Sequence, residues 1–203
     1  MKSSTEEILP ILGTAMSAGF YAGRIRIADQ PFALIVAPKS GGECAHVAWN
    51  SSLKSVAGAS SYCDGHANTL TMARAGSKLA KWALDLRIGG FDDWYLPSQD
   101  ELEICYRNLK PSTEKNWCYA RSGINLSALV PTYPYTPDLP VQTLAESFKS
   151  GGNEAFNLDW YWTSTRHASA PDSAWTQDFL SGYQGHSPKD DEFRARAVRR
   201  SPI

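Results

Sequence analysis

The stretch Gly89–Leu102, with the sequence GGFDDWYLPSQDEL, is the part of the chain that most strongly indicates its fold. Its two glycines predict a tight turn, and the aromatic residues that follow predict a short strand. Ser98 and Glu101 have the spacing of a capping box, which predicts that a helix begins at Ser98. Trp94 and Leu96 lead directly into this helix, so we expect both side chains to be buried.

Two helices are predicted around this stretch. The first covers roughly residues 69–87, with Asn68 as its expected cap and Gly89-Gly90 as its stop. Apolar residues recur there at helical spacing, namely Met72, Ala75, Leu79, Ala83 and Leu86. The second helix covers roughly 98–109 and ends before Pro111. Cys105 lies on its apolar face and is expected to be a buried thiol.

The remaining periodic segments predict strands. Alternating and continuous apolar runs predict a hairpin, and three further short candidates follow a long irregular loop over residues 111–150. The strands are expected at 24–27, 32–36, 160–165, 174–179 and 193–198. Because strands and helices do not alternate, the sequence predicts an α+β fold rather than a doubly wound parallel sheet. We expect two helices packed on an antiparallel sheet, together with the long irregular loop region.

The N-terminal residues have a different texture. Residues 1–20 carry a short apolar stretch and then small residues, so we expect an arm for attachment or oligomerisation in front of a domain over 21–203. Glu6 and Glu7 stand where a secretory signal would be positive, so no signal peptide is expected. A homotrimer or another closed ring of low order, with this arm at the contact, is the expected assembly.

Composition narrows the classes of partner. Twenty basic against twenty-one acidic side chains give a net charge of −1, which argues against a nucleic-acid partner. No run approaches ~20 apolar residues, so membrane insertion is not expected. The four cysteines form no CxxC pair, a disulfide is not indicated, and synthesis in a reducing bacterial cytoplasm is the interpretation that fits best.

Motifs of known catalytic and metal sites are missing from the sequence. The four histidines are scattered, and there is no GxSxG elbow, P-loop or GxGxxG. Asp64-Gly65 resembles the start of a calcium loop, but His66 and Asn68 stand where acidic ligands belong, so a turn is expected. We therefore predict no catalytic residues, no metal site and no cofactor.

Three motifs in order resemble a known family. GGFDDWYLPSQDEL (residues 89–102) is similar to the W-x-LP-[ST]-x-x-EL hallmark of the Lcl C-terminal domain, which ends a bacterial collagen-like adhesin. YWTST (161–165) and RARAVRR (194–200) match the family's other two hallmarks. The resemblance covers about residues 20–200.

The resemblance implies a C-type-lectin-like fold, related to formylglycine-generating enzymes and to variable proteins of diversity-generating retroelements. It further implies a binding role, with host-cell recognition at a phage or prophage tail or an adhesin tip. No cysteine follows Cys118, which argues against the oxidase activity of the enzyme relatives. No collagen-like Gly-X-Y tract precedes the domain, which favours a virion accessory protein.

The leading hypothesis is thus a non-enzymatic, tail-associated receptor-binding protein located in the virion. Its partners would be tail or baseplate proteins and a bacterial cell-surface glycan or protein. The alternatives are a hydrolase or oxidase on the same fold, with carboxylates of the loop region as acid and base, and a structural virion component without its own ligand.

A ligand-binding patch is predicted on the strand at 174–179. Its alternation places Trp175, Gln177 and Phe179 on one face, which we expect to be the core because of its larger apolar side chains. The opposite face and the neighbouring turns then supply the patch. The predicted ligand-binding residues are Arg166, His167, Thr176, Asp178, Leu180, Tyr183 and His186.

Overall fold

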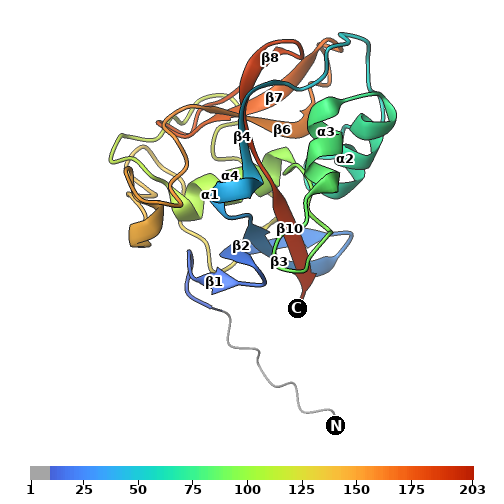
Figure 1. Ribbon diagram of the computed structural model, residues 1–203. Helices are drawn as coiled ribbons and strands as arrows, with labels where there is room; N and C mark the ends of the chain where they lie inside the picture. The colour runs from blue at the N-terminus through green and yellow to red at the C-terminus, as the bar shows by residue number, and fades with distance from the viewer. Residues whose placement is uncertain (1–9) are drawn as a thin grey trace.

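The computed structural model describes residues 10–203 and contains two sheets with a helix between them. The first sheet has the order β1-β2-β3-β10, and β5 pairs with the outer part of β2. Its strands are β1 (Ala15–Met16), β2 (Gly19–Ile27), β3 (Gln30–Val36), β5 (Ala128–Leu129) and β10 (Val198–Pro202). Figure 1 shows this sheet at the bottom of the molecule, the second sheet at the top and α4 between them.

The second sheet has the order β4-β9-β6-β7-β8. Its strands are β4 (Glu43–Ala48), β6 (Trp160–Arg166), β7 (Ser173–Asp178), β8 (Gln184–Pro188) and β9 (Glu192–Arg196). All neighbouring strands in the two sheets are antiparallel except β6 and β9, which run parallel. The α+β class expected from the sequence is confirmed, with this one parallel pair added.

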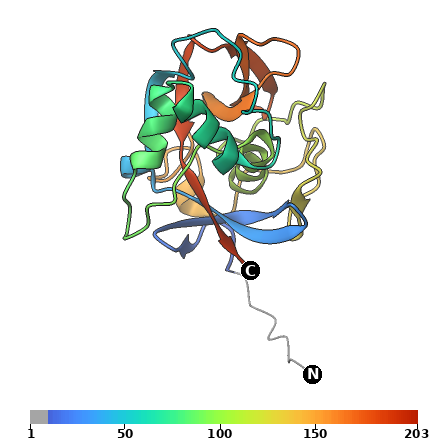
Figure 2. The ribbon, with the colours of Figure 1, turned by 90° about the vertical axis from the view of Figure 1, so that its right-hand side faces the viewer.

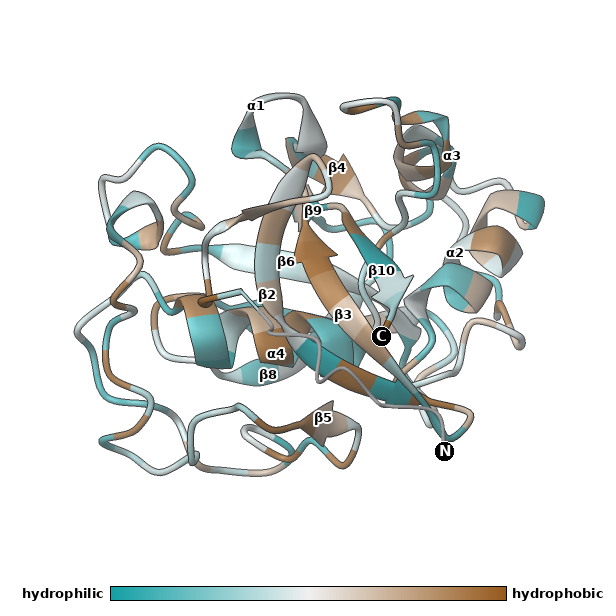
Figure 3. Ribbon diagram, turned by 90° about the horizontal axis from the view of Figure 1, so that it is seen from below, coloured by the Kyte–Doolittle hydropathy of each residue, from teal (hydrophilic) through white to brown (hydrophobic). Residues whose placement is uncertain are grey.

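The predicted hairpin is formed by β2 and β3. Its turn is made by Ala28 and Asp29, which have positive φ of 47° and 62°. Two consecutive residues of positive φ match the right-handed twist of paired strands. In Figure 3 most of β3 is coloured as hydrophobic, as its Phe-Ala-Leu-Ile-Val run requires for a strand buried between neighbours.

The first predicted helix is two helices, α2 (Gly65–Arg74) and α3 (Lys78–Asp85). Gly76 interrupts the run with a φ of 91°, and Ser77 caps α3 by accepting a hydrogen bond from Ala80 N. The prediction of one helix over 69–87 was wrong because apolar spacing continues across a break that the glycine and the serine impose. Asp64, not Asn68, caps α2.

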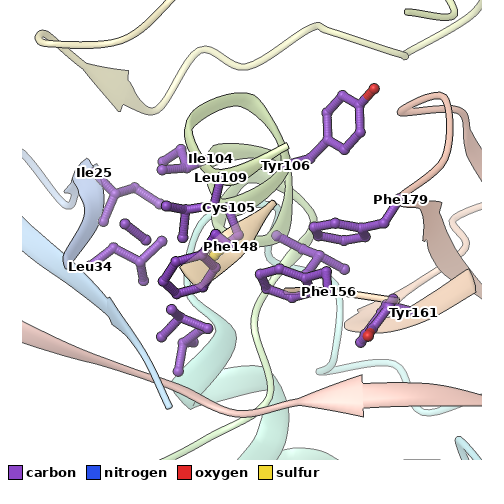
Figure 4. Packing of buried hydrophobic residues seen from close by; sticks show 14 of the residues in the cluster. Ile25, Leu34, Ile104, Cys105, Tyr106, Leu109, Phe148, Phe156, Tyr161 and Phe179 are labelled. Carbon is purple, nitrogen blue, oxygen red and sulfur yellow. The ribbon is translucent and has the colours of Figure 1, made fainter. Parts of the chain in front are cut away.

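The second predicted helix is α4 (Gln99–Leu109), and its capping box is confirmed. Every residue of α4 is buried, including the polar ones. One face of α4 packs in the main core, which Figure 4 shows with Ile25 and Leu34 on one side and Phe156 and Phe179 on the other. The Cys105 thiol is part of this core, as expected.

The polar face of α4 is covered by the long loop that follows it. Asp100 pairs with Arg121 at 2.8 Å, and Glu103 accepts hydrogen bonds from Arg107 and Asn125. Figures 1 and 2 both show this loop region, in yellow-green, on the opposite side of α4 from α2 and α3. The expected irregular segment 111–150 therefore covers one side of the domain. Its regular parts are β5 and the 3-10 helix η1 (Glu146–Phe148).

The described part of the N-terminal arm belongs to the body of the domain. Residues 10–20 pack on the domain: Gly13 contacts the region of Leu109 and Phe148, and β1 pairs with β2. The expected boundary at residue 20 thus cuts through the first sheet. Residues 1–9 lie outside the described part of the chain. Within residues 10–203, none of the helices has both the length and the apolar character needed to span a membrane.

Candidate functional site

The three hallmark motifs meet each other at the centre of the molecule. Tyr95 makes a two-way backbone bridge with Val198, and the Pro97 carbonyl accepts hydrogen bonds from the Ser164 amide and hydroxyl. Thr165 accepts a hydrogen bond from Gln99 N at the start of α4. The hallmarks therefore join the two sheets to α4, and their role in the structure is to hold the fold together.

Glu101 lies at the middle of this junction. Its carboxylate accepts hydrogen bonds from Ser98 N, Gly65 N and the Tyr95 hydroxyl, so one side chain supports the starts of both α2 and α4. Burial raises the pKa of Glu101 to about 7, although these hydrogen bonds oppose the shift. The side chains of Trp94 and Leu96, which precede this helix, are fully buried, and this confirms the prediction for both.

The four arginines of RARAVRR each form an ion pair with a carboxylate from another part of the chain. Arg194 pairs with Asp159, Arg196 with Glu154, Arg199 with Asp93 and Arg200 with Asp64. The predicted strand 193–198 is also two strands. β9 belongs to the second sheet, β10 to the first, and Ala197 between them bonds to Ala37 and Gly42. These residues form the link between the sheets.

The predicted ligand-binding residues fall into three groups. Thr176, Tyr183 and His186 come together in one pocket of the second sheet. Arg166 and His167 lie at the end of β6, and Asp178 and Leu180 belong to the turn between β7 and β8. The first group lines a cavity.

The pocket lies on the face of β6, β7 and β8 that carries Trp162, and it has a volume of about 330 Å³. Register places Trp162, Thr176 and Gly185 in one row across the strands, with Trp160, Asp178 and Tyr183 in the next. We call it the aromatic pocket. Its lining is Trp160, Thr176, Tyr183, Gly185, His186, Ser187 and Phe193.

Tyr183 meets the rings of Trp160 and Trp117 edge to face, and Phe193 lies tilted at 45° to Trp160. The Trp160 centroid lies 5.6 Å from that of Tyr183 and 6.4 Å from that of Phe193, and Trp117 extends the row at 5.4 Å from Tyr183. Trp117 is brought there by the long loop, through a hydrogen bond from its amide to the Ser181 carbonyl. We call Trp117, Tyr183, Trp160 and Phe193 the aromatic strip. The first ring is 48% exposed and the other three are half-buried.

The inside-out assignment of the strand was wrong at Thr176. Its side chain is 1% exposed, because Trp162 beside it packs with Trp49 and Phe193 and covers that face of the sheet. Gln177 and Phe179 are buried as expected, and Leu180 is exposed, whereas Trp175 is only half-buried. A five-stranded sheet covered on both faces does not follow a simple alternation of inside and outside.

Asp178 and Arg166 are occupied by the fold itself. The Asp178 carboxylate accepts hydrogen bonds from the amides of Leu180 and Ser181 and from the Ser181 hydroxyl. Arg166 donates to the carbonyls of Ala57 and His167. Replacing Asp178 by Ala would remove the acceptor that these three donors share, so we expect it to destabilise the turn.

His167 and His186 stack beside Trp175, next to the aromatic pocket. The imidazole centroids are 4.1 Å apart, and the Trp175 ring lies 4.9 Å from His167. His167 Nδ1 accepts a hydrogen bond from Ala170 N. Burial is the main reason why the pKa of His167 is lowered, and His186 and Arg166 lower it further.

This lowered pKa predicts a pH dependence of stability. Since the folded state binds the His167 proton less well than the unfolded chain does, its contribution to the free energy of unfolding should fall as pH decreases below about 6.5. His167→Asn keeps an acceptor for Ala170 N and removes the titration. We expect the difference between urea unfolding free energies at pH 7.5 and 5.5 to shift in the variant, with less loss at pH 5.5 than in the parent. If the difference is the same in the variant and the parent, His167 does not cause this pH dependence. Glu101, whose pKa is raised, contributes with the opposite sign, but both proteins contain it and its contribution cancels in the comparison.

Sequence reasoning missed Trp160, Phe193, Gly185 and Trp117 as parts of the site. The alternation of Trp160 and Trp162 could have placed both rings on one face. No local pattern connects Trp117 to the sheet, because its position depends on how the long loop folds. Among residues 10–203, no group of three or more His, Cys, Asp or Glu side chains is arranged to hold a metal ion.

The fold and the site define an α+β domain with a small aromatic pocket on the second sheet. The chain belongs to the Lcl C-terminal domain family, whose family model matches residues 42–199. This match contains the first two hallmarks, the third as far as Arg199, and the aromatic pocket, but it begins after the β2–β3 hairpin that the resemblance was expected to include. A search of curated proteins found no match to the chain.

Proposed function

We propose that this chain is a ligand-binding module that recognises a bacterial cell surface through the aromatic pocket. The observation that supports this most is the row of four contacting aromatic rings, of which none is fully buried. Aromatic residues that are partly exposed around a concavity are typical of binding sites, because they offer large apolar contact area at low entropic cost. Membership of the Lcl C-terminal domain family supports the same class of function.

The lining of the pocket supports binding rather than catalysis. The titratable residues that line the pocket are His186 and Tyr183, and the His186 imidazole itself stacks on His167 beside Trp175. A hydrolase or oxidase needs convergent acidic, basic or nucleophilic groups around the reacting atoms. The carboxylate of Asp178, which the register places on the same face as Thr176, is already engaged in its turn. The C-type-lectin-like fold is part of this proposal, as is the absence of enzymatic activity.

The biological setting forms the second part of the proposal. We propose a tail-associated receptor-binding protein of a phage or prophage, located in the virion and contacting tail or baseplate proteins. This part depends on the resemblance alone. Electron microscopy of phage particles with an antibody against the chain tests it, and labelling of the tail tip is the expected result.

Binding to intact cells tests the pocket. We expect Tyr183→Ala to weaken binding of the fluorescently labelled protein to its host cells at least about tenfold, the loss typical of a central aromatic anchor. Its free energy of unfolding should change by no more than about 1 kcal/mol, because the ring is half-buried and outside the main core.

Tyr119→Ala is the matched control. Tyr119 is 71% exposed and is not part of the pocket lining, so its replacement should leave both quantities near those of the parent. Full binding by Tyr183→Ala, with a folded protein, would contradict the assignment of the pocket.

The proposal for the assembly of several copies of the chain concerns the region around residues 10–14. Pro10–Thr14 line a largely apolar cavity of about 530 Å³ together with residues 143–147, and Ile11 and Leu144 beside it are 79% and 80% exposed. We propose that a homotrimer forms with this region at the contact. Light scattering of the full chain is expected to give three times the monomer mass, and a monodisperse monomer would contradict it.

A further inference from the structure

We infer that the aromatic pocket takes an uncharged sugar ring of a cell-surface polysaccharide, and that the aromatic strip carries the neighbouring rings of the same chain. This inference depends on the proposed function and specifies its ligand. It follows from four features of the pocket: its rings, an unpartnered hydroxyl, its lack of fixed charge and the glycine in its floor.

The arrangement of rings suits a ligand that is apolar on one face and polar at its edge. The C–H groups of a pyranose ring carry slight positive charge and pack against the negative face of an aromatic ring. The pocket of about 330 Å³ is at the lower end of ligand-site volumes, so it has room for about one ring. The strip continues beyond it through Tyr183 to Trp117, which offers further stacking positions along a chain.

Thr176 supplies an unsatisfied polar group in the lining. Its side chain is 1% exposed, and among the described residues its hydroxyl has no hydrogen-bond partner. A buried hydroxyl without a partner is unfavourable by about 1–3 kcal/mol, so a ligand hydroxyl that pairs with it gains much of this free energy. Ser187, which shares a face of β8 with Gly185, adds a hydroxyl to the same lining. A sugar supplies hydroxyls and an apolar face within one small ring.

The charges around the pocket favour an uncharged ligand. The described residues that line it include no Asp, Glu, Lys or Arg. Arg194, on the neighbouring strand β9, is engaged by Asp159 and Glu43. A sulfated or phosphorylated polymer would normally be held by basic side chains that are free to pair with it. An extended peptide is also disfavoured, because it would require a longer groove with regularly spaced backbone partners.

Gly185 keeps the pocket open. It lies opposite Thr176 in the register, and a Cβ at this position would stand 3.4 Å from Trp160 Cζ3 and 3.5 Å from Tyr183 Cε1. These are ordinary contact distances, and the residue does not have a positive φ, so a side chain is tolerated by the backbone. A β-branched side chain suits a strand and would fill the space between the two rings.

The experiment combines sugar titrations with pocket variants. The probes are neutral oligosaccharides of glucose, galactose, mannose, rhamnose and N-acetylglucosamine, with dextran sulfate and a proline-rich peptide for comparison, followed by tryptophan fluorescence and by NMR. We expect at least one neutral oligosaccharide to bind, and we expect Gly185→Val to weaken it at least about tenfold. The melting temperature should stay within a few degrees of the parent, since no core side chain is removed.

Two further variants separate the pocket from the strip. Thr176→Val should weaken the sugar about five- to tenfold, the loss of one good hydrogen bond, while its melting temperature equals or exceeds that of the parent. Trp117→Ala should weaken longer oligosaccharides and leave a disaccharide unaffected. If Thr176 has only a structural role, replacing it will not affect sugar affinity.

The outcomes distinguish this inference from the proposed function. Periodate treatment of host cells, which destroys sugar diols, should abolish binding, whereas protease treatment should not. If protease abolishes binding and Gly185→Val also does, the pocket binds a protein and the sugar inference is overturned while the proposed function stands. If dextran sulfate binds and the neutral sugars do not, the inference is overturned as well. If Gly185→Val binds cells as the parent does, the proposed function of the pocket fails together with the inference.

Discussion

Replacing Arg196 by methionine is expected to lower the free energy of unfolding by about 3–5 kcal/mol, the range for removing one partner of a buried ion pair. The Arg196 side chain is fully buried, and its guanidinium donates to the Ala37 carbonyl, the Glu154 carbonyl and the Glu154 carboxylate. It also lies 4.8 Å above the Phe156 ring. The methionine would leave two carbonyls and a carboxylate without their donor between the sheets. Urea unfolding at neutral pH measures the change.

Lys115→Met is the matched control. Lys115 and its partner Asp138 have side chains that are 81% and 76% exposed, so the loss should be no more than about 1 kcal/mol. Combining Arg196→Met with Glu154→Gln should cost less than the sum of the two single variants, because the second change removes the stranded charge. A loss below about 1 kcal/mol for Arg196→Met would show that the contacts of Arg196 do not hold the two sheets together.

Replacing Trp94 by alanine is expected to destabilise the protein by about 3–5 kcal/mol, the range for emptying a large aromatic site in a core. Trp94 is fully buried in a small cluster with Ile35, Ala37 and Ala197. The Cβ that Gly19 lacks would come within 3.1 Å of its Cη2 atom, so the backbone of β2 packs directly against the indole. This close packing leaves little freedom to collapse around the cavity.

Trp117→Ala provides the comparison for this second variant. Trp117 is 48% exposed, so its loss should change stability by about 0.5 kcal/mol or less, even though it should affect binding of long sugar chains. Thermal unfolding of the two variants side by side measures the difference. Similar destabilisation by both variants would contradict the assignment of Trp94 as a buried residue that packs against the backbone of β2.

The elements that the sequence predicts well are those whose causes are local. The capping box at Ser98 and Glu101, the β2–β3 hairpin and the strand at Trp160 each depend on neighbouring residues, and each is present. The family was also identified from short motifs, and the family model confirms it. The break at Gly76 was missed although it is local, because the apolar spacing dominated the prediction.

The site depended on contacts between distant segments. The sequence pointed to Thr176, Tyr183 and His186, but their pocket exists only because Trp160 and Phe193 come from strands that pair across the second sheet.

What the sequence determined by itself is the α+β class, the helix at 99–109 and the family, since these are written in spacing and short motifs. Three features depend on the tertiary structure alone. Thr176 is buried, Asp178 and Arg166 form hydrogen bonds within the fold, and the RARAVRR arginines pair with carboxylates of other segments. The physical reason is that burial and ion pairing depend on which segments lie on both faces of a sheet. In this domain the segments that cover those faces are the long loop, α4 and the C-terminal strands, and they are distant in sequence from the residues that they bury.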